Sequence, residues 1–122
     1  MTALATPFTA AGEIDLDAWS RLLRQQLEGG TRVLVVAGST GEGASLYDVE
    51  YDALLRSAVE AASGKVPVVA GTGLSSTDKT IARTRRAAGL GAPDAAAVAR
   101  EAGVRPLILG DAIDSVQGPG GA

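Results

Sequence analysis

The residues best suited to chemistry in this chain are two adjacent hydroxyls, Ser39 and Thr40, within the stretch Gly38-Ser39-Thr40-Gly41-Glu42. An apolar run, residues 33–37, comes directly before this stretch and predicts a buried strand. Hydroxyls and free backbone N–H groups in such a loop donate hydrogen bonds to an anion. The dipole of a following helix also favours negative charge at this position. We therefore expect a site for an anionic small molecule at the carboxyl end of this strand.

Each candidate residue also has a structural interpretation. The two hydroxyls could instead cap the loop or bond to neighbouring backbone. Glu42 could act as a general base, but we expect its carboxylate to accept hydrogen bonds from N–H groups of the loop. Arg83, Arg85 and Arg86 are expected to form a solvated helix face. The segment Gly71-Thr72-Gly73 predicts a tight turn and is too short to indicate phosphate binding.

Composition excludes several kinds of chemistry. The 122 residues include neither cysteine nor histidine, which excludes disulfides, catalytic triads that need histidine, and metal sites with thiolate or imidazole ligands. We expect no metal and no cofactor. The net charge of −3 and the aromatic content of 3% argue against nucleic acid or an anionic membrane as a partner. No apolar run approaches the ~20 residues of a membrane span, so we expect a cytoplasmic location.

Hydrophobic spacing predicts the elements that position these residues. Three apolar runs that do not alternate with polar residues are typical of a buried parallel sheet, and an amphipathic helix follows each run. The predicted strands are residues 3–5, 33–38 and 66–70, and the predicted helices are residues 16–28, 48–62 and 77–90. Right-handed crossovers place the carboxyl ends of parallel strands at one edge of the sheet. We therefore expect residues 38–42 and 71–75 to lie together.

The spacing also predicts which side chains face the core. For the three helices these are Leu16, Trp19, Leu22, Leu23 and Leu27, then Tyr51, Leu54, Leu55, Ala58 and Val59, then Ile81, Thr84 and Ala88. Phe8 is expected in the core as well. After residue 92 the repeat stops, and the pattern predicts a short helix (93–102), a strand (104–109) and a frayed tail (117–122).

Three segments resemble signatures of the dihydrodipicolinate synthase / N-acetylneuraminate lyase family, in the right order and at the right spacing. The opening is Ala3-Leu4-Ala5-Thr6-Pro7-Phe8, followed by Gly12-Glu13-Ile14-Asp15-Leu16-Asp17; the second is Val36-Ala37-Gly38-Ser39-Thr40-Gly41-Glu42; the third is Val66-Pro67-Val68-Val69-Ala70-Gly71-Thr72-Gly73. The resemblance covers about residues 2–92. It divides the chain into an N-terminal part of the family's barrel, residues 1–92, and a divergent segment with its tail, residues 93–122.

The resemblance implies an α/β fold, namely a partial (β/α)8 TIM barrel with its first three βα units. It also implies the chemistry of a class I aldolase-type lyase, in which a lysine forms a Schiff base with pyruvate or a related keto acid. By motif position, Ser39 and Thr40 would hold the carboxylate of the keto acid. Ser39 would also occupy a proton-relay position. The family commonly forms homotetramers.

The resemblance also implies what this chain lacks. The family carries its Schiff-base lysine on the sixth strand, whereas the lysines here are Lys65 and Lys79. We therefore expect a lyase fragment without aldolase activity of its own. The sequence alone does not decide whether the chain takes part in catalysis together with other strands. The alternatives are one half of a split lyase and a small α/β module that binds an anion or a nucleotide. A partial barrel has open sheet edges and an uncovered apolar strand face. Three outcomes are compatible with this: an unstable chain, association through the open edges with copies of itself or with a complementary fragment, or residues 93–122 folding back with 104–109 paired at one edge.

Overall fold

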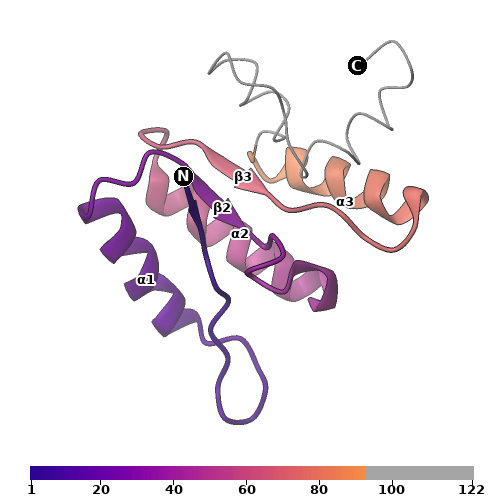
Figure 1. Ribbon diagram of the computed structural model, residues 1–122, viewed down its shortest axis with the longest axis horizontal. Helices are drawn as coiled ribbons and strands as arrows, with labels where there is room; N and C mark the ends of the chain where they lie inside the picture. Colours follow the sequence, from indigo (N-terminus) through magenta and orange to yellow (C-terminus); the bar gives the residue numbers. More distant parts are fainter. Residues whose placement is uncertain (93–122) are drawn as a thin grey trace.

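Strands and helices alternate along the part of the chain that the computed structural model describes, residues 1–92 (Figure 1). The strands are β1 (Thr2–Ala3), β2 (Leu34–Val36) and β3 (Val68–Ala70). The helices are α1 (Leu16–Glu28), α2 (Asp48–Ala62) and α3 (Thr77–Gly89), and a short 3₁₀ helix, η1 (Gly43–Ser45), precedes α2. The predicted order of elements through α3 is confirmed. The helix, strand and tail predicted after residue 92 lie outside the described residues.

The three strands form one parallel sheet in the order β1-β2-β3, with Val35 of β2 opposite Val69 of β3. The strands are shorter than predicted. β2 ends early because Ala37 has a φ of 55°, which takes the backbone out of the extended conformation. β3 begins late because Pro67 has no N–H for the ladder, although its carbonyl accepts from the N–H of Leu34 at 3.0 Å.

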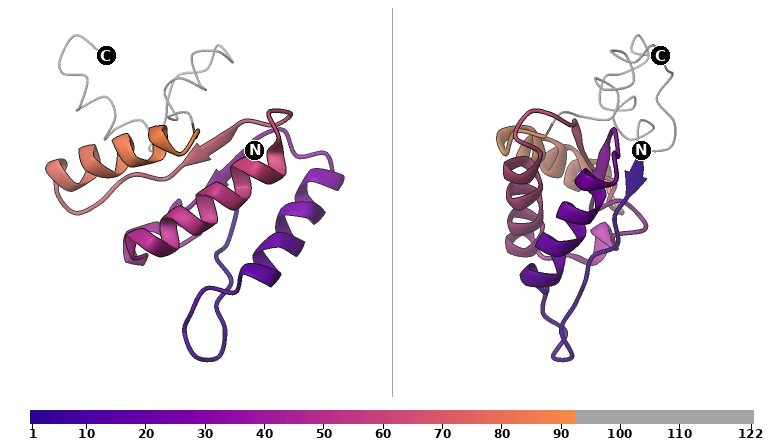
Figure 2. Two further views of the ribbon diagram at one scale, coloured as in Figure 1. Left: turned by 180° about the vertical axis from the view of Figure 1, so that it is seen from behind. Right: turned by 90° about the vertical axis from the view of Figure 1, so that its left-hand side faces the viewer.

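Helices α1 and α2 lie on one face of the sheet (Figure 2). Strand side chains on this face join the helices in the apolar core; they are Leu34, Val36, Val68 and Ala70. Val35 and Val69 alternate to the opposite face and are 4% and 1% exposed. The prediction of an uncovered apolar strand face is therefore wrong at these two positions. Within residues 1–92, no helix has the length and apolar character needed to cross a membrane.

Helix α1 has the predicted bounds and most of the predicted core face. The carboxylate of Asp15 caps its first turn by accepting a backbone N–H at 2.9 Å. Trp19 and Leu23 are buried, as predicted. Leu16 is 45% exposed, contrary to prediction, because the first turn of α1 lies beyond the end of the sheet, beside the loop after β1 (Figure 1).

Phe8 lies in the loop after β1, outside the core. Phe8 pairs with Ile14 in an isolated antiparallel bridge at the base of this loop, which extends away from the sheet (Figure 1). Gly12 turns the loop with a φ of 84°, a conformation that favours glycine. The ring of Phe8 is 40% exposed there, so the prediction that it lies in the core is wrong.

Helices α2 and α3 differ in how well their inner faces could be predicted. The face of α2 is confirmed, with Tyr51, Leu54, Leu55 and Ala58 buried and Val59 packed against the core. The face of α3 is displaced by one residue, because the buried side chains are Thr80, Arg83 and Ala87. Ile81 and Thr84 are half-buried, and Ala88 is exposed. A charged residue thus occupies the inner stripe of α3, where periodicity predicts apolar ones.

Candidate functional site

Loops from all three strands meet at the carboxyl edge of the sheet. The N–H of Gly71, directly after β3, donates to the carbonyl of Val36 at the end of β2, at 2.8 Å. The hydroxyl of Thr6, after β1, donates to the carbonyl of Gly41 at 2.7 Å. The prediction that the loops after β2 and β3 lie together is confirmed. The loop after β2 lies between the other two.

Close packing around one carbonyl explains the glycines of these loops. A Cβ atom on Gly43 would lie 1.8 Å from the carbonyl oxygen of Ala37, and a Cβ on Gly71 would lie 2.2 Å from the same oxygen. Both distances are far shorter than any contact that a side chain tolerates. Backbone from two loops therefore encloses the Ala37 carbonyl, and only glycine fits at either position.

Ser39 and Thr40 lie on the exposed side of this packed loop. Hydrogen bonds hold the residues around them, since the N–H groups of Gly41 and Gly43 both donate to the carbonyl of Gly38, at 3.1 and 3.0 Å. Within residues 1–92, neither the hydroxyls nor the backbone N–H groups of Ser39 and Thr40 donate to any acceptor. Capping of the loop by the two hydroxyls is therefore not observed. The two exposed residues thus keep four hydrogen-bond donors without an acceptor in the described part of the chain.

Glu42 does not have its predicted structural role. It adopts the left-handed conformation with a φ of 56°, and its side chain is exposed. No N–H group in the described part of the chain donates to its carboxylate. Its backbone N–H donates to the carbonyl of Ser39 at 3.1 Å, so its contribution to the loop is made by the main chain.

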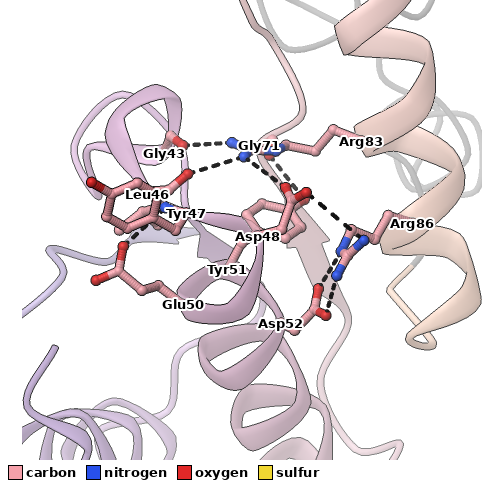
Figure 3. Close-up of polar contacts among 10 residues, drawn as sticks. All are labelled: Gly43, Leu46, Tyr47, Asp48, Glu50, Tyr51, Asp52, Gly71, Arg83 and Arg86. Carbon is pink, nitrogen blue, oxygen red and sulfur yellow. Dashed lines mark hydrogen bonds and ion pairs between the residues drawn. The ribbon is translucent and has the colours of Figure 1, made fainter.

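Tyr51 of α2 supports the loop that follows β3. Its hydroxyl donates to the carbonyl of Gly71 at 3.0 Å, and its side chain is fully buried (Figure 3). Burial raises the pKa of Tyr51 from 10.0 to about 12, although the nearby Arg83 guanidinium lowers it. The phenol therefore stays neutral at physiological pH and holds the first residue after β3.

Arg83 does not lie on a solvated helix face, contrary to the prediction from the sequence. It is only 7% exposed, and its guanidinium donates to the carbonyls of Gly43 and Leu46 at 2.6 and 3.1 Å (Figure 3). A further contact joins it to the Asp48 carboxylate at 3.4 Å. Its central carbon lies 4.6 Å from the centroid of the Tyr51 ring, within the range of a cation–π interaction.

The other two arginines behave differently from Arg83. Arg86 forms a bidentate pair with Asp52, with both N–O distances 2.6 Å, and this hydrogen-bonded pairing lowers the pKa of the Asp52 carboxyl. Arg85 is exposed, as predicted. The sequence does carry a signal for the paired arginines. Asp48 and Asp52 share one face of α2 at a spacing of four, and Arg83 and Arg86 share one face of α3 at a spacing of three.

A groove of about 450 Å³ lies near the starts of α2 and α3, and it does not include Ser39 or Thr40. Its lining residues are Ala44, Asp48, Leu74, Ser75, Lys79, Ala82, Arg83 and Arg86. Lys79 is exposed on α3. Lys65 is exposed before β3, at the opposite edge of the sheet from Ser39. Neither lysine belongs to the loops that carry the two hydroxyls.

Comparison with known proteins agrees with the resemblance in the motifs. The model of the dihydrodipicolinate synthetase family matches residues 1–99. A curated relative, 4-hydroxy-tetrahydrodipicolinate synthase of Xanthomonas axonopodis pv. citri, is 68% identical over 92 residues, which are 75% of this chain and 30% of the relative. This chain thus spans about a third of the length of its curated relatives.

Solved structures agree with the sequence comparison. A monomeric dihydrodipicolinate synthase variant superposes with a TM-score of 0.72 at 41% identity, over 75% of this chain and 30% of that one. The chloride-inhibited dihydrodipicolinate synthase of Acinetobacter baumannii, solved with pyruvate, superposes with a TM-score of 0.71 at 33% identity, over 74% of this chain and 31% of that one. These similarities favour a lyase-type barrel over an unrelated nucleotide-binding module.

Proposed function

Because the chain belongs to the dihydrodipicolinate synthetase family, we propose that residues 1–92 form the keto-acid-binding part of a 4-hydroxy-tetrahydrodipicolinate synthase-type lyase. The proposed substrate is pyruvate or a related keto acid, and the similar Acinetobacter structure was solved with pyruvate. The three strand–helix units would be the first three of a (β/α)8 barrel. Binding at the carboxyl ends of their strands agrees with the usual position of active sites in such barrels.

The observation that supports this proposal best is the arrangement of donors at Ser39 and Thr40. Two hydroxyls and two backbone N–H groups belong to these adjacent, exposed residues, and none has an acceptor in the described part of the chain. A carboxylate offers about four lone-pair positions to such donors. The surrounding loop is held in place by close backbone packing at Gly43 and Gly71. A rigid set of donors of this kind suits the carboxylate of a small keto acid.

The two hydroxyls have different proposed roles. Thr40 binds the carboxylate and so orients the keto group. Ser39 binds the same carboxylate and also relays a proton, which a hydroxyl can do because it both donates and accepts hydrogen bonds. Lys65 and Lys79 are not proposed as the Schiff-base amine, since neither lies in the loops at the carboxyl edge. The amine is proposed to come from a later strand of the barrel, on a longer polypeptide or on a second chain.

Borohydride trapping tests the assignment of the amine. The chain is incubated with pyruvate and sodium borohydride, which reduces a Schiff base to a stable adduct, and is then digested for mass spectrometry. We expect no adduct on Lys65 or Lys79. A pyruvate adduct on either lysine would contradict the proposal that the nucleophile lies elsewhere.

Reconstitution tests the role of the hydroxyls. The chain is co-expressed with the rest of the Xanthomonas relative, and pyruvate-dependent turnover is measured. We expect Ser39→Ala to lower kcat by about 100-fold or more, because a proton relay is lost. We expect Thr40→Val to raise the KM for pyruvate about tenfold, because one hydrogen bond to a charged group is lost.

The matched control is Ser45→Ala, which removes an exposed hydroxyl from η1, a few residues beyond the site. We expect this variant to keep both kinetic constants. Equal effects of Ser39→Ala and Ser45→Ala, or no turnover in the combined chains, would contradict the proposed role of the loop.

A further inference from the structure

Arg83 reaches from α3 to the turn that follows the two hydroxyls. Its two terminal nitrogens donate to the carbonyls of Gly43 and Leu46, which flank the η1 turn, at 2.6 and 3.1 Å (Figure 3). These residues are 40 and 37 positions away in the sequence. A single buried side chain therefore links helix α3 to the η1 turn, although the two elements are far apart in the sequence.

The η1 turn is in turn connected to the hydroxyls by the main chain. The N–H of Gly43 donates to the carbonyl of Gly38 at 3.0 Å, which closes the loop around Ser39 and Thr40. Beyond Gly43, the N–H of Leu46 returns to the Gly43 carbonyl at 3.3 Å. That carbonyl also accepts from Arg83, so the guanidinium contacts the residue at which the loop closes.

The two carbonyls, rather than a carboxylate, determine how the guanidinium is oriented. The contact with Asp48 is longer, at 3.4 Å, and the Asp48 side chain is 63% exposed, so this pair contributes little. The Nε atom of Arg83 is buried and has no hydrogen-bond partner within residues 1–92. An orientation that leaves one N–H unpaired implies that the other contacts dominate. The ring of Tyr51 supports the planar group from one side, at 4.6 Å.

We propose that Arg83 is a positioning residue that holds the loop of Ser39 and Thr40 in its binding conformation through the carbonyls of Gly43 and Leu46. This proposal rests on the proposed function of that loop as a keto-acid carboxylate site. Arg83 does not touch the acid itself.

Amide hydrogen exchange tests the proposal without any ligand. The amides of Gly43 and Leu46 report on the loop, and their exchange is followed by NMR in the 122-residue chain. We expect Arg83→Leu to raise their exchange rates about tenfold or more, relative to amides of α1. Arg86→Leu, one turn further along α3, removes the pair with Asp52 and should leave these two amides unchanged.

Arg83→Lys covers the case in which the leucine variant does not fold. Lysine keeps the charge but cannot donate to both carbonyls in the geometry of a planar guanidinium. We expect it to restore part of the protection that the leucine variant loses. Unchanged loop exchange in Arg83→Lys and Arg83→Leu would overturn the proposal, as would unprotected amides at Gly43 and Leu46 in the parent chain.

Pyruvate titration separates this proposal from the proposed function. Pyruvate is added to the parent chain and to both variants at position 83, and the amide shifts of Ser39 and Thr40 are followed. We expect a dissociation constant about tenfold higher in Arg83→Leu and an intermediate value in Arg83→Lys. Equal affinities with altered loop exchange would overturn the positioning role. No pyruvate response in the parent would refute the carboxylate site, while the exchange data still decide whether Arg83 holds the loop.

Discussion

Helices α1 and α3 flank α2 and have the same length, 13 residues, but they are attached to the molecule by different interactions (Figure 1). α1 buries Trp19 and Leu23 against α2 and the sheet. α3 buries a threonine, an arginine and an alanine. The first attachment is a hydrophobic one, and the second depends on hydrogen bonds and ion pairs.

The difference explains which helix can influence the site. Burial of apolar surface is roughly proportional to area and has no preferred direction, so α1 stabilises the fold without orienting a particular loop. Hydrogen bonds from a guanidinium are directional, and the long side chain of Arg83 reaches past the helix surface to two named carbonyls. A helix with little apolar surface can thereby fix the loop that carries Ser39 and Thr40.

Removal of the main apolar anchor of α1 should have the largest effect. Trp19 is fully buried, and its indole N–H donates to the carbonyl of Leu54 at 3.2 Å. We expect Trp19→Ala to lower the free energy of unfolding by about 3–5 kcal/mol, through lost apolar contacts and an unfilled cavity. Urea denaturation followed by circular dichroism measures this. Leu16→Ala on the same helix is the control, because Leu16 is 45% exposed, and a loss as large as that of Trp19→Ala would contradict the comparison.

Removal of the anchor of α3 should have the second largest effect. We expect Arg83→Leu to lower the free energy of unfolding by about 2–3 kcal/mol, because two buried carbonyls lose a charged donor. The exposed Arg85 provides the control, and Arg85→Leu should leave the urea midpoint almost unchanged. If both variants unfolded at the same urea concentration, α3 would not be attached through Arg83.

Removal of the Tyr51 hydroxyl should have a smaller effect on the free energy of unfolding, and this effect should depend on pH. We expect Tyr51→Phe to lower the free energy of unfolding by about 1 kcal/mol at pH 7, since the hydrogen bond to Gly71 is lost. Burial raises the pKa of the folded phenol from 10.0 to about 12. The neutral phenol thus stabilises the parent fully below pH 10, and this contribution is lost as the pH rises from 10 to about 12.

Urea denaturation at several alkaline pH values checks this dependence. The control is Tyr47→Phe, because Tyr47 is 78% exposed and its hydroxyl makes no hydrogen bond within residues 1–92. The parent and Tyr47→Phe should lose stability in parallel above pH 10, and Tyr51→Phe should lose less. Identical pH profiles for all three chains would show that Tyr51 does not titrate in the expected range.

The pair between Asp52 and Arg86 should have the smallest effect, because both groups reach solvent. We expect Asp52→Asn to lower the urea midpoint slightly at low salt and not at all at about 1 M NaCl, where charges are screened over about 3 Å. Hydrogen bonding to Arg86 lowers the pKa of Asp52 below 3.8. Its contribution is therefore present above pH 3.8 and is lost as the pH falls below that value.

A carboxylate elsewhere on α2 separates this pair from general charge effects. Glu60 is exposed, and its side chain makes no ion pair within the described residues. Glu60→Gln should leave the urea midpoint unchanged at either salt concentration. A salt-dependent loss of the same size in both variants would assign the effect to net charge and not to the pair with Arg86.

Local features of the sequence predict the helices well. The bounds of α1 and α2 match the prediction, since both have apolar residues at helical spacing. Asp15 caps the start of α1, and at the start of α2 the Glu50 carboxylate accepts the backbone N–H of Tyr47. The strands are predicted in order but not in length. Strand ends depend on the conformation of Ala37 and on the position of Pro67 opposite Leu34, which periodicity does not describe.

The candidate site could be predicted only in part. The motif around Ser39 and Thr40 indicates the two hydroxyls, because they follow an apolar strand in a glycine-rich loop. The role of Arg83 could not be found from its own segment. Three arginines on one helix are ordinarily solvated, and only the positions of Gly43, Leu46 and Tyr51 show that one of them is buried.

The amino-acid sequence alone predicts the alternation of strands and helices, the family and the two candidate hydroxyls, because these depend on neighbouring residues and on short motifs. The tertiary structure decided which helix face is buried, why Gly43 and Gly71 must be glycines, and that Arg83 holds the loop. Each of these depends on atoms brought together from segments up to 40 residues apart. Contacts of that kind follow from how the chain folds back on itself, which local periodicity does not encode.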